Sequence, residues 1–390
     1  MTDLVTRPVP APTDTLRRAA PALVGYAAVR ALGLVVLAVW SAARGTSPHT
    51  LLSARWDALW YSRVAALGYG YEVRLPNGDV HSNLAFFPLL PWLERLGSAL
   101  TPLSYADAGL AVSTLASLAA AWGILAVADH VYGRRVGVCA VLVWAVLPVG
   151  IVQSMAYSES LFTALAAWAL YAVLRERWVS AGVLASLAGL TRPVGAAVVA
   201  AVWVAAIHSA VRDRGTPPAE RPPRASVRRV LGMLLAPVGA AGYVLWVGHR
   251  TGRGPLGYLD VQAGWRNGFD GGYAFARFAA ARFTSLASVP AGVGLVAGIA
   301  LIVWLYVVCV RQGQPVPLLV YAGVVTALAL GAASYFGSKP RLLMPAFPLL
   351  LPLARALARG RPSRSAAVLG GVAVASAVYG AFWLNGSGPP

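Results

Sequence analysis

The stretch PALVGYAAVRALGLVVLAVWSAA, from Pro21 to Ala43, decides what kind of fold this chain adopts. It is apolar from end to end apart from Arg30, and about 20 apolar residues are enough for a helix to cross a bilayer. Its small last residues would also suit the end of a cleaved signal peptide. The run is long enough to span, however, so we expect an uncleaved first transmembrane helix.

The composition of the whole chain agrees with a membrane location. Of the 390 residues, 58% are hydrophobic and only 12% are charged, whereas soluble domains carry roughly a quarter of charged residues. The chain is therefore predicted to be an all-α polytopic membrane protein, with residues 21–385 forming a single transmembrane domain of about 11 helices. The apolar segments are 21–43, 108–128, 137–155, 160–174, 178–191, 193–211, 230–248, 286–310, 315–335, 342–357 and 365–385.

The net charge of +18 indicates an orientation rather than a nucleic-acid partner. With the N-terminus in the cytosol, 18 of the 32 basic residues fall on short cytosolic loops, as the positive-inside rule requires. Zinc-ligand spacings and RNA-binding motifs are missing from the sequence, so we expect membrane lipids as partners and no nucleic acid. We expect a multi-pass protein of the cell membrane with a disordered cytosolic tail at 1–20, a cytosolic basic loop at 212–229, and extracytoplasmic loops at 44–107 and 249–284.

The first extracytoplasmic loop is rich in aromatic and apolar residues, which is unusual for a solvated segment. Six of them recur near helical spacing, as in an amphipathic helix lying in the membrane interface: Leu52, Trp56, Leu59, Trp60, Val64 and Leu67. A second interfacial or re-entrant helix is expected within 83–100.

This loop contains RWDALWY, Arg55 to Tyr61, which places an acid among aromatics in a chain with only 14 acidic residues. Asp57 is a candidate general base, with Tyr61 one helical turn later on the same face. A paired acid or a helix-start acid that meets the helix dipole is the alternative. Flanking tryptophans would hold the acid at a depth where it meets a lipid-borne substrate, so Arg55, Trp56, Trp60 and Tyr61 are expected to line the pocket.

Glu159 in AYSESLF is expected in a tight turn on the same, extracytoplasmic side of the membrane. It either caps a helix or lines the pocket together with Tyr157, and the sequence leaves both readings open. Glu159 is one of eight acids expected on or near the outer face, namely Asp57, Glu72, Asp79, Glu94, Asp107, Glu159, Asp260 and Asp270.

Three isolated cations are candidates for binding an anion. Arg192 lies at membrane depth, where Pro193 breaks the helical pattern. Lys339 and Arg341 lie at the start of an expected helix, where cations are electrostatically disfavoured. An acid beside such cations suits sugar transfer from a lipid phosphate, since the carboxylate activates a hydroxyl and the cations stabilise the departing phosphate.

Five stretches occur here in the order found in one family: RWDALWYSRVAALGY, FFPLLPWLERL, YSESLFTALAAWAL, LAGLTRPVGAAVV and KPRLLMPAFPLLLPLA. Over about residues 50 to 355 the chain resembles the PIG-V-type mannosyltransferases, which are GT-C membrane glycosyltransferases. The resemblance implies a GT-C-like bundle, a polyprenyl-phosphate-mannose donor and inverting transfer outside the cytosol. On that match Asp57 is the base, and Arg192 and Arg341 hold the donor phosphate.

The arginine-rich, alanine-rich and glycine-rich composition is typical of a GC-rich bacterial genome. A bacterial member would use a glycolipid or another envelope hydroxyl as acceptor. A pair of acids spaced DxD does not occur near Asp57, so we expect no metal and no cofactor. A lipid or sugar transporter without transferase activity is the alternative class, and the break at Arg192 favours it.

Overall fold

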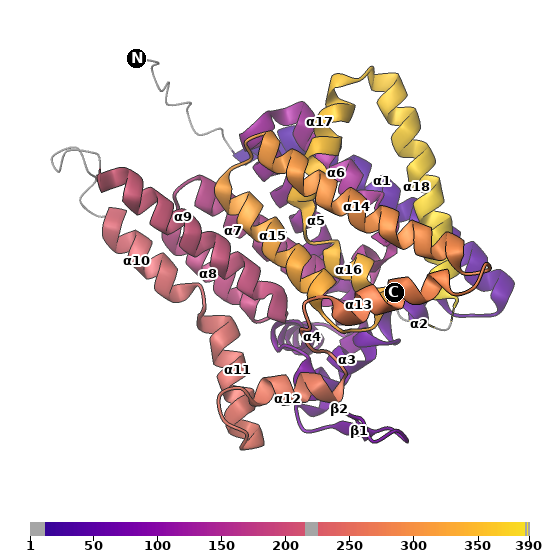
Figure 1. The fold of residues 1–390 in the computed structure, drawn as a ribbon. Coiled ribbons are helices and arrows are strands. Elements are labelled where there is room, and N and C mark those ends of the chain that lie inside the picture. Colours follow the sequence, from indigo (N-terminus) through magenta and orange to yellow (C-terminus); the bar gives the residue numbers. More distant parts are fainter. Residues whose placement is uncertain (1–11, 215–224, 387, 389–390) are drawn as a thin grey trace, which may run out of the picture.

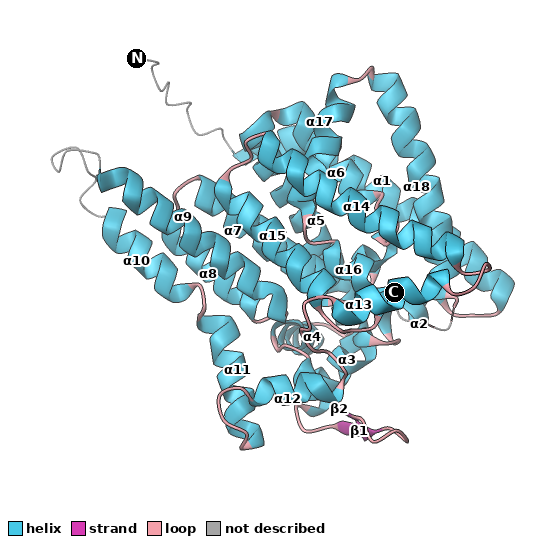
Figure 2. Cartoon of the chain, viewed as in Figure 1, coloured by secondary structure: helices cyan, strands magenta, loops and turns pink. Residues whose placement is uncertain are grey.

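The computed structural model describes residues 12–214, 225–386 and 388, and they form a bundle of helices (Figure 1). One short hairpin, β1 (Glu72–Arg74) with β2 (Val80–Ser82), is the exception, as the colouring of Figure 2 shows. Its strands are antiparallel, with Val73 opposite His81.

The described residues contain six helices that are long and apolar enough to cross a membrane, or seven if a bent pair is counted as one span. The six involve α1 (Pro12–Arg44), α5 (Tyr105–Tyr132), α9 (Ala196–Arg214), α10 (Ala225–Leu235) continued by α11 (Val238–Thr251), α14 (Val289–Arg311) and α18 (Pro362–Leu384). The bent pair contains α16 (Lys339–Leu343) and α17 (Leu351–Arg359), with an angle of 76° at the break. Three apolar helices are shorter, namely α7 (Ser158–Leu174), α8 (Trp178–Gly189) and α15 (Val316–Gly331).

The expected count of 11 membrane-spanning helices is therefore not confirmed. In the segment 137–155, α6 (Arg134–Ala145) ends before Pro148, and the chain continues in the short 3-10 helix η2 (Gly150–Ser154). Proline cannot donate the backbone hydrogen bond that a helix interior requires. The Arg30 guanidinium donates to the carbonyls of Ala145 and Gly150, so it satisfies backbone groups that the break leaves open.

Two boundaries differ from the expected ones, one in the N-terminal tail and one in the basic loop. Helix α1 begins at Pro12, so the part of the expected tail from residue 12 to residue 20 is helical, while residues 1–11 lie outside the described residues. In the basic loop, α9 continues to Arg214 and α10 begins at Ala225, and residues 215–224 lie outside the described residues.

The first loop folds into more elements than the aromatic spacing predicts. The expected interfacial helix is divided into α2 (Pro48–Ser53) and α3 (Asp57–Leu67), so Leu52 and Trp56 do not share a helix with Trp60. The hairpin and the 3-10 helix η1 (Asn83–Ala85) follow, and then α4 (Leu89–Leu100). Helix α4 exposes Trp92, Leu96 and Leu100 on one face, which is the pattern of an interfacial helix. The second loop contains α12 (Gly257–Gly264) and α13 (Tyr273–Ala280).

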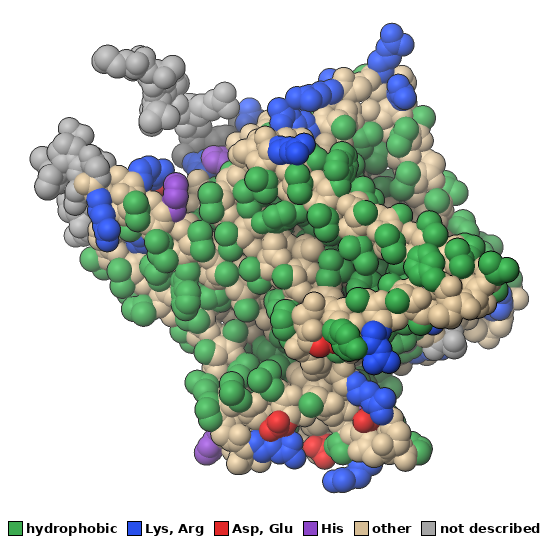
Figure 3. Space-filling view, viewed as in Figure 1, with side chains coloured by type: hydrophobic (Ala, Val, Ile, Leu, Met, Phe, Trp, Pro, Cys, Tyr) green, Lys and Arg blue, Asp and Glu red, His purple; other side chains and the backbone are tan. Residues whose placement is uncertain are grey.

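The two ends of the bundle differ in charge. Arg135 donates to the carbonyl of Gly360 at 2.8 Å, and Arg212 pairs with Glu176 at 2.5 Å. The first contact joins the α5–α6 end to the α17–α18 turn, and the second joins the end of α9 to the α7–α8 turn. The hairpin and α12 lie at the opposite end, where most acidic side chains of the visible face gather, and apolar side chains cover the middle (Figure 3).

The bundle core lies where α1, α5, α6 and α7 meet, with Tyr26 stacked on Trp144 at 5.5 Å. Glycines allow α8 to pack closely on α10 and α11. A Cβ added at Gly239 would overlap the Ser186 carbonyl oxygen, whereas one added at Gly242 would meet no atom within 4 Å.

This contrast predicts opposite effects of the same substitution on one helix. Gly239→Ala should lower the unfolding midpoint in detergent, because the methyl group forces α11 away from α8 at a cost of about 1–3 kcal/mol. Gly242→Ala is the matched control, which gains helix propensity without a clash and should leave the midpoint unchanged or higher. Equal midpoints for the two variants would contradict the close packing of α8 and α11.

Candidate active site

Asp57 is the first residue of α3, and the backbone in front of it is strained. Trp56, the residue before it, has a φ of 52°, a conformation that side chains with a Cβ rarely adopt and that concentrates at functional sites. The backbone N–H of Asp57 donates to the Tyr157 hydroxyl at 3.4 Å. The strained turn thus fixes the acid at the N-terminus of α3, where the helix dipole favours a carboxylate.

The partner of the Asp57 carboxylate comes from the far end of the sequence. Nη1 of Arg341, on α16, donates to Oδ2 of Asp57 at 2.7 Å. The Arg341 side chain is only 8% exposed and that of Asp57 is 26% exposed. The Asp57 carboxylate is therefore the more solvent-exposed member of this pair, and the Arg341 guanidinium is buried behind it.

Arg341 contacts a second acid, which lies deeper in the bundle. Its Nε lies 3.3 Å from Oε1 of Glu159, whose side chain is 1% exposed. The same carboxylate oxygen pairs with Nη1 of Arg192, which is 13% exposed. Glu159 lies in the first turn of α7, as the helix-start alternative expects, and its side chain is buried and does not line an open pocket. It holds two arginines that come from opposite halves of the chain.

The four side chains Asp57, Arg341, Glu159 and Arg192 form one row of alternating charge, which we call the charge network. Two carboxylates and two guanidinium groups leave no net charge in a nearly buried place, where an unpaired ion would be strongly disfavoured. The network balances its charges internally, and Asp57 is its most exposed member. An anion that approached Asp57 would meet Arg341 immediately behind it.

Two tyrosines enclose the charge network. The ring of Tyr157 lies 5.0 Å from the Arg341 guanidinium carbon, a cation–π contact. Tyr61, one turn after Asp57, shares a 2.7 Å hydrogen bond with the Ser158 hydroxyl. Burial raises the pKa of Tyr61 above its ordinary value, so this phenol stays protonated and does not compete with Asp57 as a base.

Lys339, also expected to bind the donor phosphate, makes its hydrogen bonds outside the charge network. Its ammonium group donates to the carbonyls of Ala329 at 2.8 Å and Ala332 at 2.7 Å, at the C-terminal end of α15. A cation at a helix N-terminus is disfavoured, but the same cation is favourable at a helix C-terminus. The side chain folds back to α15 for this reason, and its position is explained without a phosphate.

The other expected pocket residues lie around the network without entering it. Arg55 stacks on Trp56 at 4.3 Å and donates to the carbonyls of Leu384 and Gly386, so it faces the end of α18. Trp60 stacks on Phe86 at 5.6 Å. It also meets Trp265 of the second loop edge to face at 4.9 Å.

Sequence reasoning missed three members of this region. Ser158 and Trp265 carry no motif of their own, and only the tertiary contacts with Tyr61 and Trp60 reveal their place. Glu94 was expected at the outer face, but its side chain is fully buried. Its position in the amphipathic pattern of α4, on the side opposite to Trp92, is the signal that could have predicted this.

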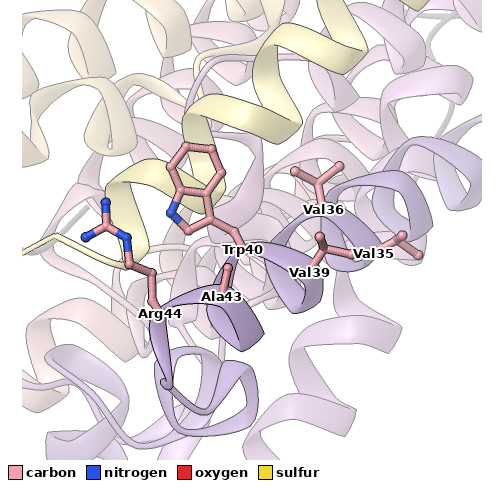
Figure 4. A pocket seen from close by; sticks show the side chains of 6 residues that line it. All are labelled: Val35, Val36, Val39, Trp40, Ala43 and Arg44. Carbon is pink, nitrogen blue, oxygen red and sulfur yellow. The ribbon is translucent and has the colours of Figure 1, made fainter.

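Metal-ligand clusters and a second cavity are the other places where a ligand could bind. Among the described residues, groups of three His, Cys, Asp or Glu side chains close enough to hold a metal ion are not found. A separate cavity of about 380 Å³ lies along α1 and contains none of the expected site residues (Figure 4). Its lining is apolar except at one end, and consists of Val35, Val36, Val39, Trp40, Ala43 and Arg44.

Comparison with solved structures shows the class of fold. The chain superposes on ArnT from Cupriavidus metallidurans bound to undecaprenyl phosphate with a TM-score of 0.51 and 18% identity. The match covers 86% of this chain and 60% of ArnT, so the chain spans less than two thirds of that protein. The similarity confirms the expected all-α fold of the GT-C membrane glycosyltransferases.

Two further comparisons add detail. A family model described as dolichyl-phosphate-mannose-protein mannosyltransferase matches residues 83–216, which contain Tyr157, Glu159 and Arg192. The archaeal oligosaccharyltransferase AglB from Archaeoglobus fulgidus, in complex with an inhibitory peptide and a dolichol-phosphate, matches with a TM-score of 0.45 and 13% identity over 94% of this chain and 56% of its own. The search of curated proteins found no match.

The charge network predicts a large stability effect for its most buried acid. Glu159→Gln leaves two arginines with one carboxylate in a buried place, and the expected loss is about 3–5 kcal/mol, measured as a lower unfolding midpoint in detergent. Glu176→Gln is the control, because its pair with Arg212 is more than half exposed and should contribute at most about 1 kcal/mol. Similar midpoints for both variants would show that the network does not stabilise the bundle.

Proposed function

We propose that the chain is an inverting membrane glycosyltransferase that uses a polyprenyl-phosphate sugar as donor. The observation that carries this proposal is the direct contact between a half-open carboxylate, Asp57, and a buried guanidinium, Arg341. General-base catalysis and stabilisation of a leaving phosphate require these two groups at one reaction centre.

The reaction follows from the roles of the two groups. The acceptor hydroxyl oxygen attacks the anomeric carbon of the donor sugar, and its proton passes to the Asp57 carboxylate. The bond between the anomeric carbon and the phosphate oxygen breaks, and its electron pair leaves with the lipid phosphate. Arg341, with Arg192 behind it, then stabilises that anion. A lipid phosphate needs no protonation to leave, so one carboxylate is sufficient, in contrast to glycoside hydrolysis.

The proposal also includes the identity of the donor, which is a lipid phosphate that carries mannose. The family model that covers 83–216 is described by a dolichyl-phosphate-mannose donor, and the ArnT structure holds undecaprenyl phosphate. Both support a lipid phosphate as carrier. The five stretches that resemble PIG-V-type enzymes favour mannose as the transferred sugar.

The acceptor and the side of the membrane are part of the same proposal. The arginine-rich end of the bundle would face the cytosol, which places α3, the hairpin and α12 on the extracytoplasmic side of a cell membrane. The acceptor would then be a hydroxyl of a glycolipid or of another envelope component in a bacterial cell.

Asp57→Asn tests the proposed base and separates a transferase from a transporter. The variant keeps the shape of the side chain and loses its basicity, so transfer of mannose from polyprenyl-phosphate-mannose should fall by about 10²–10⁴-fold. Asp260→Asn, an exposed acid of α12, is the matched control and should keep the wild-type rate. Full turnover by Asp57→Asn in a purified assay over a panel of acceptors would refute the assignment.

Arg341→Ala and Lys339→Gln test which cation holds the donor. Loss of the guanidinium beside Asp57 should raise the KM for the donor by about tenfold or more, since a charged hydrogen bond contributes about 1.5–3 kcal/mol. Lys339→Gln should lower the unfolding midpoint, because α15 loses its capping cation, and leave the donor KM unchanged. The reverse pattern of donor KM values would assign the phosphate to Lys339.

A further inference from the structure

The carboxyl group of Glu94 is an anomaly that the proposed reaction leaves unused. Its side chain is fully buried on α4, and neither oxygen has a hydrogen-bond partner among the described residues. A buried polar group without a partner costs free energy. Such a group therefore calls for an explanation in the function or in the packing.

The sequence of α5 makes room for this carboxyl group. A Cβ added at Gly109 would lie 2.7 Å from Oε1 of Glu94 and 3.2 Å from the Cβ of Ala156. The carboxyl group thus packs in the space that the glycine leaves, and the Cβ of Ala156, the residue before Tyr157, borders the same space. Ala156 and Tyr157 are held on their other sides by the Leu52 carbonyl and the Ser113 hydroxyl.

The segment Ala156–Tyr157 forms one wall of the candidate site. The Tyr157 hydroxyl accepts the backbone N–H of Asp57, and its ring lies against Arg341. A displacement of Ala156 would therefore move both the base and its partner cation.

The charged side chains on the helices around Glu94 have other partners. Arg95, on α4 itself, donates to the Ala65 carbonyl of α3 at 2.9 Å, and Tyr61 of α3 bonds to Ser158. On α5, Asp107 accepts hydrogen bonds from Ser104 and lies 2.6 Å from His49. Beyond Tyr157, Glu159 pairs with Arg192 and Arg341. An ionised Glu94 would find no cation turned toward it within the described part of the chain.

We propose that Glu94 is a positioning residue, whose uncharged carboxyl group packs between Gly109 and Ala156 and holds Tyr157 against the Asp57–Arg341 pair. The effect on catalysis rests on the proposed function, whereas the protonation state of Glu94 does not. Burial raises the pKa of Glu94 to about 9. At neutral pH the group is uncharged, and above pH 9 its ionisation would disturb the wall of the site.

The raised pKa of Glu94 makes the stability of the folded chain decrease as the pH rises. In the unfolded chain a glutamate loses its proton near pH 4.3, while in the folded chain Glu94 keeps it up to about pH 9. Because the folded state binds the extra proton in this window, stability falls as the pH rises from about 4 to about 9 and then levels off. Glu94→Gln removes this dependence, since glutamine does not titrate.

The experiment compares the pH dependence of two readouts in purified wild-type protein, Glu94→Gln and the control Glu72→Gln, an exposed acid of β1. The unfolding midpoint should fall from pH 5 to pH 9 in the wild type and the control, and fall less in Glu94→Gln. The rate of transfer should drop about tenfold per pH unit above pH 9 in the wild type. In Glu94→Gln this alkaline loss should disappear while the donor KM stays unchanged.

An identical pH dependence of both readouts in all three proteins would overturn the proposal. If Glu94→Gln fails to fold, infrared spectroscopy of the wild type decides. A protonated-carboxyl band present at pH 7 and lost near pH 9 supports the assignment, and its absence at pH 7 overturns it. The midpoint and the infrared band need no turnover, so a chain that transferred no sugar would contradict the proposed function and leave these two results valid.

Discussion

The structure depends on one constraint, which is that four charges buried at one end of an apolar bundle must balance one another. Asp57, Arg341, Glu159 and Arg192 come from the start of α3, from α16, from the start of α7 and from the break before α9. Removal of one member would leave an uncompensated ion, which is strongly disfavoured. The network therefore fixes how the two halves of the chain meet.

The same constraint explains several irregularities of the backbone. The α8–α9 break gives Arg192 an extended backbone from which it reaches Glu159. The positive φ of Trp56 turns the chain so that Asp57 begins a helix beside Tyr157. The bent pair of α16 and α17 brings Arg341 into the interior. Strained or broken backbone gathers at the candidate site, as it does at functional sites generally.

Part of this arrangement could be predicted from the sequence. Hydropathy predicted an all-α membrane protein, and Pro193 predicted the break at Arg192, since both follow from local properties. The number of spans could not be predicted, because α6 ends at Ala145, where the distant Arg30 satisfies the carbonyls of Ala145 and Gly150. The position of Lys339 was also not predicted, although the carbonyls of Ala329 and Ala332 that it caps lie only 10 and 7 residues before it in the chain.

The chemical roles depend on partners that lie far apart in the chain. Asp57 and Arg341 were each singled out from the sequence, yet their contact joins residues separated by 284 positions. Glu159 was expected at a surface turn and is the most deeply buried member of the network. The residue types indicated acid–base chemistry and phosphate binding, whereas only the structure shows which acid pairs with which arginine.

The central claim is that Arg341 holds the donor phosphate next to the base. A cryo-electron microscopy structure of the Asp57→Asn variant with polyprenyl-phosphate-mannose bound tests it most directly. The account predicts the phosphate within hydrogen-bonding distance of the Arg341 guanidinium and the anomeric carbon next to residue 57. A phosphate bound elsewhere, with Arg341 still enclosed by its acidic neighbours, would contradict the account.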